Sequence, residues 1–162
     1  MNLILVRVDD RFVHGQILES WIPYLDVQCV IVVNDYLASD DFQKAIMSMA
    51  IPDRIIIKII SIKDVAGLIH DPLLKGKRAL LIVSSIKDAY KICQEGIFFT
   101  RLNIGNLKMQ DGCKQLSFSV WVDHEDVDIL KRFIADGVYI SLQSVPRERD
   151  IDLRTIIEMI DI

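Results

Sequence analysis

Short apolar runs rich in β-branched residues alternate along the chain with segments in which apolar residues recur at helical spacing. Runs of this kind are typical of strands buried on both faces of a sheet. They cover residues 3–8, 27–33, 54–60, 79–83, 102–104, 116–122 and 138–142. Their alternation with helical segments indicates βαβ units, in which the strands run parallel.

The helical segments carry start and stop signals. A first helix, over residues 17–22, is predicted to end at Pro23 and Asp26. Residues 39–41 cap a second helix, which we expect to turn one apolar stripe toward the core. That stripe consists of Phe42, Ala45, Ile46 and Met49. The buried side of a later helix, capped by Asp123, consists of Val127, Leu130, Phe133 and Ile134. Further helices are expected over residues 62–69, 86–93 and 152–159.

Together these elements predict an α/β fold of three layers, α/β/α. Its central sheet is mostly parallel, with about six or seven strands. The length of 162 residues suits a single domain over residues 1–162.

Composition narrows the class of protein. Apolar residues make up 51% of the chain and charged residues 26%, which excludes disorder as a description of the whole. The net charge of −4 lacks the basic excess of a nucleic-acid binder. Charged residues interrupt every apolar stretch before it reaches about 20 residues, the length of a membrane-spanning helix, so no membrane insertion is expected. The three cysteines are scattered along the chain, which favours reduced thiols in the cytoplasm. Charged residues follow the first apolar run too soon for an apolar targeting segment, which favours the same location.

The densest polar cluster follows the first predicted strand, at residues 9–16. Ligands of open α/β sheets bind at the carboxyl ends of strands, so this loop has the expected position of an active site. His14 precedes Gly15 at a helix start, whose first N–H groups, from about Gly15 to Leu18, favour an anion. Arg11 adds a planar guanidinium suited to phosphate oxygens.

This combination suits nucleophilic chemistry at the histidine. A neutral imidazole is a competent nucleophile, and both the helix start and Arg11 favour the neutral ring of His14. Asp9 or Asp10 would accept a hydrogen bond from one ring nitrogen and leave the other free to attack. The residues do not decide between these two carboxylates. The alternative is that His14 is a structural loop residue.

The same strand ends allow other interpretations. A metal-dependent phosphoesterase would gather its ligands where the first two strands end, at Asp9, Asp10, His14 and Asp35. That spacing matches no known cage. No Walker loop and no G-x-G occurs, so a dinucleotide site of that kind is excluded. Ser84 and Ser85 follow the fourth strand, where Ser85 is expected as an N-cap and either hydroxyl could reach the same anion.

Residues 7–16, which read RVDDRFVHGQ, resemble the signature of enzyme IIB of the mannose/fructose/sorbose family. That family belongs to the phosphoenolpyruvate-dependent sugar phosphotransferase system, the PTS. The likeness continues in family order at residues 32–35, 49–52, 101–105, 119–120, 123–130 and 145–146. The chain differs from the family pattern at Asn106, at residues 84–86 and at residues 147–150.

The resemblance implies a protein-Npi-phosphohistidine–sugar phosphotransferase. Nδ1 of His14 would take a phosphoryl group from phosphorylated IIA and pass it to a sugar hydroxyl held by the IIC and IID membrane proteins. Catalysis would involve His14, Asp9, Asp10 and Arg11. The phosphate would be surrounded by Arg11, Gly15, Gln16, Ser84 and Ser85, and the site rim would contain Arg7, Asn34 and Asp35. No metal or organic cofactor is implied.

The resemblance also implies a setting for the chain. It would be cytoplasmic, associated peripherally with the membrane permease and bound to no nucleic acid. The sugar is not specified, and self-association into a homo-oligomer stays open. The alternative function is a regulatory phosphorelay protein of the same fold without a dedicated sugar permease.

Overall fold

A seven-stranded sheet organises residues 1–159, which are the residues that the computed structural model describes. Its strands stand in the order β3-β2-β4-β1-β5-β8-β9. The parallel strands are β1 (Asn2–Asp9), β2 (Cys29–Val33), β3 (Ile56–Ile60), β4 (Arg78–Val83), β5 (Arg101–Asn106) and β8 (Tyr139–Leu142). Only the short edge strand β9 (Ile151–Asp152) runs antiparallel to its neighbour in this sheet of the described chain. The predicted sheet is confirmed.

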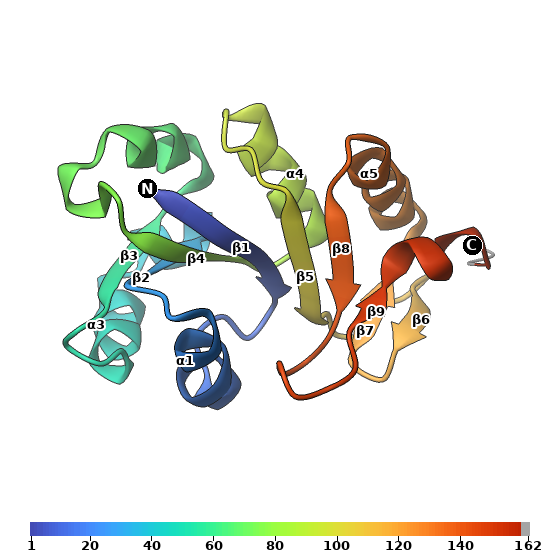
Figure 1. Cartoon of the computed structure of the whole chain (residues 1–162), viewed down its shortest axis with the longest axis horizontal. Helices are drawn as coiled ribbons and strands as arrows, with labels where there is room; N and C mark the ends of the chain where they lie inside the picture. The colour runs from blue at the N-terminus through green and yellow to red at the C-terminus, as the bar shows by residue number, and fades with distance from the viewer. Residues whose placement is uncertain (160–162) are drawn as a thin grey trace.

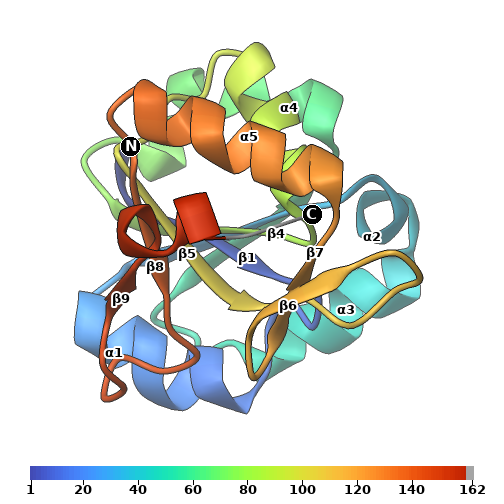
Figure 2. The same ribbon diagram turned by 90° about the vertical axis from the view of Figure 1, so that its right-hand side faces the viewer.

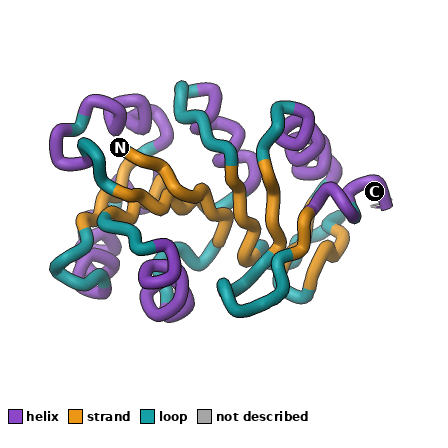
Figure 3. The backbone as a smooth tube through the Cα atoms, viewed as in Figure 1, coloured by secondary structure: helices purple, strands orange, loops and turns teal. Residues whose placement is uncertain are grey.

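Helices cover both faces of the sheet, which gives the three predicted layers (Figures 1 and 2). One face carries the π-helical turn Ile17–Trp21, α1 (Ile22–Leu25) and α3 (Asp41–Ala50), with α2 (Asp35–Ser39) just before α3. The other face carries the 3-10 segment Ile62–His70, α4 (Ile86–Gln94) and α5 (His124–Ala135). Figure 3 shows the strands gathered between these outer helices.

The apolar core is divided between the two faces of the sheet because successive strand residues point in opposite directions. In β1, Val6 and Val8 pack toward α4 and α5, whereas Leu5 packs toward α1. Arg7 lies on the α1 face as well, over the ring of Trp21. A charged residue is therefore enclosed in the middle of the central strand.

Three predicted elements need correction. Residues 116–122 are not one strand but part of a hairpin, β6 (Lys114–Ser117) and β7 (Val120–Val122), because the chain turns at the exposed Phe118. Pro23 does not end the first helix: α1 continues directly from the π-helical turn and contains Pro23, and Asp26 ends the helix in a left-handed conformation. The predicted C-terminal helix is β9 followed by the 3-10 turns Leu153–Thr155 and Ile157–Met159.

The apolar stripe of α3 faces solvent, which contradicts the predicted orientation. Phe42 is 72% exposed and Met49 is 86% exposed. Ile51 and Ile55, which follow the helix, are buried in the part of the core that contains β2. From α3 itself, Met47 packs against this part of the core. By contrast, α5 buries Val127, Leu130 and Phe133 as predicted, with Ile134 half-buried.

Candidate functional site

The loop after β1 lies at the carboxyl edge of the sheet, between the ends of β4 and β5. The chain turns sharply there, because the Phe12 N–H donates to the Asp9 carbonyl at 3.0 Å and Phe12 has a φ of 56°. This left-handed conformation is uncommon for an aromatic residue and marks local strain. The turn brings Arg11 and His14 back beside Asp9. No sequence signal predicts it, since the position is not a glycine.

The Asp9 carboxylate is the centre of the cluster and is fully buried. Its Oδ2 lies 3.0 Å from His14 Nε2 and 2.8 Å from Arg7 Nη2. Arg11 binds both oxygens, from Nε to Oδ1 at 3.0 Å and from Nη2 to Oδ2 at 3.0 Å. Burial raises the pKa of Asp9, but the hydrogen bonds of His14 and Arg11 and the charge of Arg7 outweigh it and hold that pKa well below its usual range. Asp9 is therefore an anion at neutral pH.

This contact fixes the assignment of the two ring nitrogens of His14. Nε2 faces an ionised carboxylate, so in the neutral ring Nε2 carries the proton and Nδ1 holds the lone pair. No hydrogen bond occupies Nδ1 among residues 1–159, and the side chain is 19% exposed. The arrangement provides a neutral nucleophilic nitrogen whose opposite side is held by a buried anion.

Asp10 does not reach the histidine. Its Oδ1 accepts from Asn106 Nδ2 at 2.6 Å, and its Oδ2 accepts from the Lys108 N–H at 3.0 Å. Of the two carboxylates left open by the sequence, Asp9 contacts the ring, and Asp10 ties the loop to the end of β5. The catalytic role expected for Asp10 has no support in this geometry.

The start of the first helix offers fewer free amides than expected. The N–H groups of Ile17 and Leu18 donate to the His14 carbonyl, at 2.9 and 3.1 Å. Within residues 1–159, the backbone N–H groups of Gly15 and Gln16 are the ones that remain as donors for an anion at this helix start. The side chain of Gln16 accepts from Arg11 Nη2 at 3.1 Å, and a Gly15 Cβ would meet no described atom within 4 Å apart from its chain neighbours and the nearby helix backbone. The space beside Gly15 is open to an incoming group.

Ser84, Ser85 and Asn34 form a separate polar group at the neighbouring strand ends. Ser85 caps α4, as predicted, because its Oγ accepts from the Asp88 N–H at 3.0 Å. Ser84 Oγ donates to Asp88 Oδ2 at 2.8 Å and lies 3.3 Å from Asn34 Nδ2. With Asp10 and Phe12 these residues line a cleft of about 410 Å³ that His14 and Arg11 do not line.

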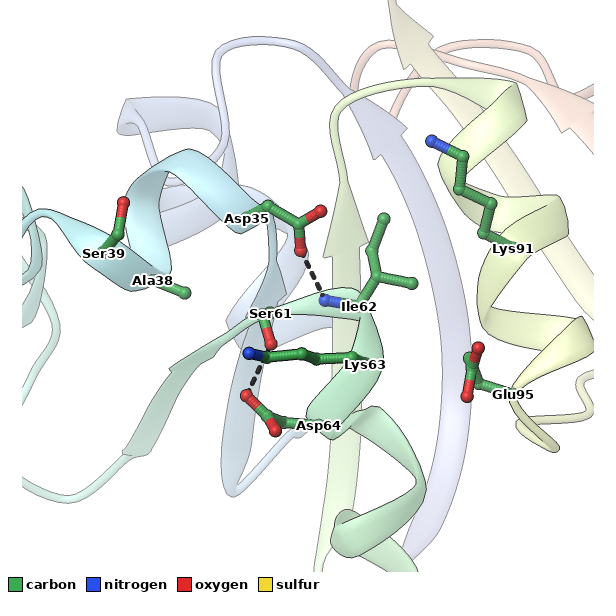
Figure 4. A pocket seen from close by; sticks show the side chains of 9 residues that line it. All are labelled: Asp35, Ala38, Ser39, Ser61, Ile62, Lys63, Asp64, Lys91 and Glu95. Carbon is green, nitrogen blue, oxygen red and sulfur yellow. Dashed lines mark hydrogen bonds between the residues drawn. The ribbon is translucent and has the colours of Figure 1, made fainter.

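Asp35 lies at yet another place. Its Oδ1 accepts from the Ile62 N–H at 2.8 Å, and it lines an open cleft of about 510 Å³ with Ser61, Asp64 and Lys91 (Figure 4). Asp35 is thus part of a different surface from His14. The residues weighed as an alternative metal cluster do not come together, and residues 1–159 contain no group of three or more His, Cys, Asp or Glu side chains placed to hold a metal ion.

Arg7 was predicted at the rim and is instead buried beneath the site, with no exposed side-chain surface. The sequence contains a signal for this burial: Arg7 stands inside the apolar run of residues 3–8, and such a run predicts a strand buried on both faces. A buried arginine requires partners, and the adjacent acidic residues of the sequence supply one of them.

None of the helices in residues 1–159 is both long and apolar enough to cross a membrane.

Comparison with known proteins places the chain in a family. The family model described as "PTS system sorbose subfamily IIB component" matches residues 3–161. The "PTS system fructose-specific EIIB component" of Bacillus subtilis is 29% identical over 152 residues, covering 94% of this chain and 93% of that protein. The "PTS system mannose-specific EIIAB component" of Escherichia coli K12 is 26% identical over 99% of this chain, but the chain spans only 50% of that protein.

A solved structure agrees in fold. The IIBSor domain of the sorbose permease from Klebsiella pneumoniae superposes with a TM-score of 0.90, covers 99% of both chains and is 24% identical. The family model matches nearly the whole sequence and by itself gives the affiliation of the protein. The chain belongs to the sorbose subfamily of IIB components of the sugar phosphotransferase system.

Proposed function

We propose that this IIB component carries a phosphoryl group on Nδ1 of His14. It accepts the group from a phosphohistidine of a IIA protein and passes it to a sugar hydroxyl held by IIC and IID membrane proteins. The observation that carries the proposal is the contact of Asp9 Oδ2 with His14 Nε2 at 3.0 Å. This contact leaves Nδ1 as the ring nitrogen with a lone pair for attack.

The chemistry requires no metal from this chain. The Nδ1 lone pair forms a bond to phosphorus while the bond from phosphorus to the donor histidine nitrogen breaks. The ring of His14 gains positive charge as the new bond forms, and the buried Asp9 anion stabilises that charge through Nε2–H, as the aspartate of a catalytic triad does. In transfer to the sugar, the hydroxyl oxygen bonds to phosphorus while the Nδ1–phosphorus bond breaks and returns its electron pair to Nδ1. The hydroxyl proton leaves to solvent or to a base at the permease site.

Arg11 and the amides of Gly15 and Gln16 are the groups that would hold the phosphoryl oxygens. The side chain of Arg11 is 40% exposed beside the ring, so it can turn toward an incoming anion. Phosphoryl transfer depends mainly on such positioning and charge stabilisation. Ser84 Oγ already donates to Asp88 Oδ2, so it would contribute only by leaving that partner. Ser85 Oγ accepts from the Asp88 N–H, so its own O–H could donate to a phosphoryl oxygen while the cap is kept.

The partners follow from the family. The mannose-specific relative of Escherichia coli carries the printed name EIIAB, which supports a IIA protein as the donor for this chain. We further propose that the chain acts in the cytoplasm and docks at the permease from there.

A phosphorylation assay tests the proposal. The purified protein is incubated with phosphoenolpyruvate, enzyme I, the histidine carrier protein and a cognate IIA. We expect an acid-labile, base-stable phosphate on His14 and none on the His14→Ala variant. The control is His124→Ala, which removes an exposed histidine of α5 and should be labelled like the wild type.

Absence of label on a folded wild type, with a IIA shown to be charged, would contradict the proposal. Adding membranes that carry IIC and IID then distinguishes the two fates of the group. Transfer to sugar indicates uptake, and a stable phosphoprotein that donates to no sugar indicates the regulatory phosphorelay.

A further inference from the structure

We propose that the two arginines of the site have different tasks: Arg7 is a fixed positioning residue that holds Asp9, and through it the ring of His14, while Arg11 is the exchangeable arginine that leaves Asp9 for the phosphoryl group. This inference rests on the proposed function of His14 for its second half only. The first half concerns the resting protein.

The guanidinium of Arg7 has no freedom to reach a ligand. Nη1 donates to Asn103 Oδ1 and to the Gln143 carbonyl, the latter at 3.1 Å. Nη2 donates to Asp9 Oδ2 at 2.8 Å and to the Ser144 carbonyl at 3.1 Å. Each terminal nitrogen of a guanidinium has two N–H groups, so all four are in use. Turning Arg7 toward a phosphate would break all four of these hydrogen bonds and would take from the buried Asn103 Oδ1 the donor that it has here, which is costly.

The packing around Arg7 leaves room for the guanidinium and little else. A Cβ added at Gly105 would lie 1.9 Å from Arg7 Nη2 and 2.1 Å from Arg7 Cζ. Trp21 covers the guanidinium at 4.9 Å from Cζ to the ring centroid, and its Nε1–H donates to the same Ser144 carbonyl at 2.9 Å. Gly105 does not have a left-handed φ, so the close approach of Arg7, and not the backbone conformation, is what a side chain at this position would disturb.

Arg11 differs in each of these respects. Its side chain is 40% exposed, and its side-chain acceptors are Asp9 and Gln16, both within the same loop. If Arg11 turns toward a phosphoryl group on Nδ1, Asp9 Oδ2 keeps its bonds to Arg7 and His14. Asp9 Oδ1 keeps the backbone N–H of Arg11, at 3.2 Å.

The consequence for chemistry is the charge of Asp9. A buried carboxylate that loses its cations takes up a proton, and a protonated Asp9 would no longer stabilise positive charge on the ring. Because Arg7 remains in place when Arg11 leaves, Asp9 stays ionised in the phosphorylated protein. Arg7 therefore acts on His14 only through Asp9, and its task is the same before and after transfer.

The sharpest test changes Gly105 rather than the arginine. Gly105→Ala leaves every polar side chain of the site in the sequence but forces the Arg7 guanidinium to move. The control is Gly67→Ala, where the added methyl would meet no atom within 4 Å and φ is not left-handed. Two readouts are taken: the tautomer of the His14 ring from its ¹⁵N chemical shifts in the resting protein, and the rate of phosphorylation by charged IIA.

We expect wild type and Gly67→Ala to show the Nε2–H tautomer. Gly105→Ala and Arg7→Lys should show a mixture of tautomers and phosphorylation slowed roughly 100-fold, the effect of a displacement of about 1 Å at a reacting group. Arg11→Ala should keep the Nε2–H tautomer while its phosphorylation slows and its phosphoprotein decays faster. A loss of rate without a change of tautomer in Arg11→Ala is the signature of the exchangeable arginine.

Two results would overturn the inference. One is a Gly105→Ala protein that melts cooperatively and keeps both the wild-type tautomer and the wild-type rate. The other is an Arg11→Ala protein whose tautomer changes as much as that of Gly105→Ala. If Gly105→Ala does not fold, Arg7→Lys provides both readouts, because it keeps the charge and loses the fork of N–H groups. Failure of wild-type phosphorylation would instead contradict the proposed function and leave the tautomer comparison intact.

Discussion

The carboxyl ends of β1 and β4 are neighbours in the sheet, and each is followed by a polar loop at a helix start, yet the polar groups are used differently. After β4, Ser85 and Ser84 bond to Asp88, three and four residues further on. After β1, Asp9 binds Arg7, which in turn binds Asn103 and the carbonyls of Gln143 and Ser144. The first pattern satisfies a helix start locally. The second fixes one buried anion against a reactive ring.

The two strand ends show how a helix cap differs from a chemical site in an α/β protein. A cap is complete within four residues and needs no other part of the fold. Asp9 is fully buried and ionised, and its partner Arg7 is held by Asn103 of β5 and by the carbonyls of Gln143 and Ser144, far away in the chain. Burying a carboxylate costs desolvation free energy. Such a group is typical of a site where an anion must lie beside a group that changes charge.

The largest expected effect comes from Asp9→Asn. The variant leaves Arg7 buried without its anion, and breaking a buried pair in this way costs about 3–5 kcal/mol of unfolding free energy. Urea denaturation measures this loss, and the His14 ring should also lose its tautomer preference. Asp10→Asn is the matched control, because Asp10 bonds only to Asn106 and the Lys108 N–H among the described residues and should cost about 1 kcal/mol.

Wild type and Asp9→Asn should also differ in how their stability changes with acid pH. The pKa of Asp9 is lower in the folded protein than in the unfolded chain, so the folded state binds fewer protons there. Its stabilising contribution is therefore complete above about pH 4, the ordinary range of an aspartate, and is lost as the pH falls further. Urea midpoints measured from pH 7 to pH 3 should fall more steeply for wild type than for Asp9→Asn. Parallel curves would mean that the Asp9 charge does not stabilise the fold.

Ser85→Ala should have the smallest effect of these changes. Loss of the cap costs about 1 kcal/mol of stability, because the Asp88 N–H loses its acceptor at the start of α4. The phosphorylation rate then decides whether Ser85 also touches the phosphoryl group. We expect it to fall less than in Arg11→Ala. A larger fall would place the β4 end inside the site and remove the distinction between the two strand ends.

Much of the architecture could be predicted from local sequence. The spacing of apolar residues indicated the parallel sheet and the buried side of α5, and the position of residues 9–16 after the first strand placed the polar loop at the carboxyl edge. These features depend on periods of two and about 3.6 residues and on capping by near neighbours, which a single sequence displays.

The tertiary structure alone decided which groups of the site meet. Arg7 lies beside Asn103 and Gln143, separated from it by 96 and 136 residues in the chain, and no local pattern encodes such distances. The choice of Asp9 over Asp10 depends on the left-handed turn at Phe12, and the exposure of the α3 stripe depends on the residues that follow that helix. Local sequence determines which surfaces a segment can bury. Competition among all segments for the same sheet decides which of these surfaces become buried and which charges become neighbours.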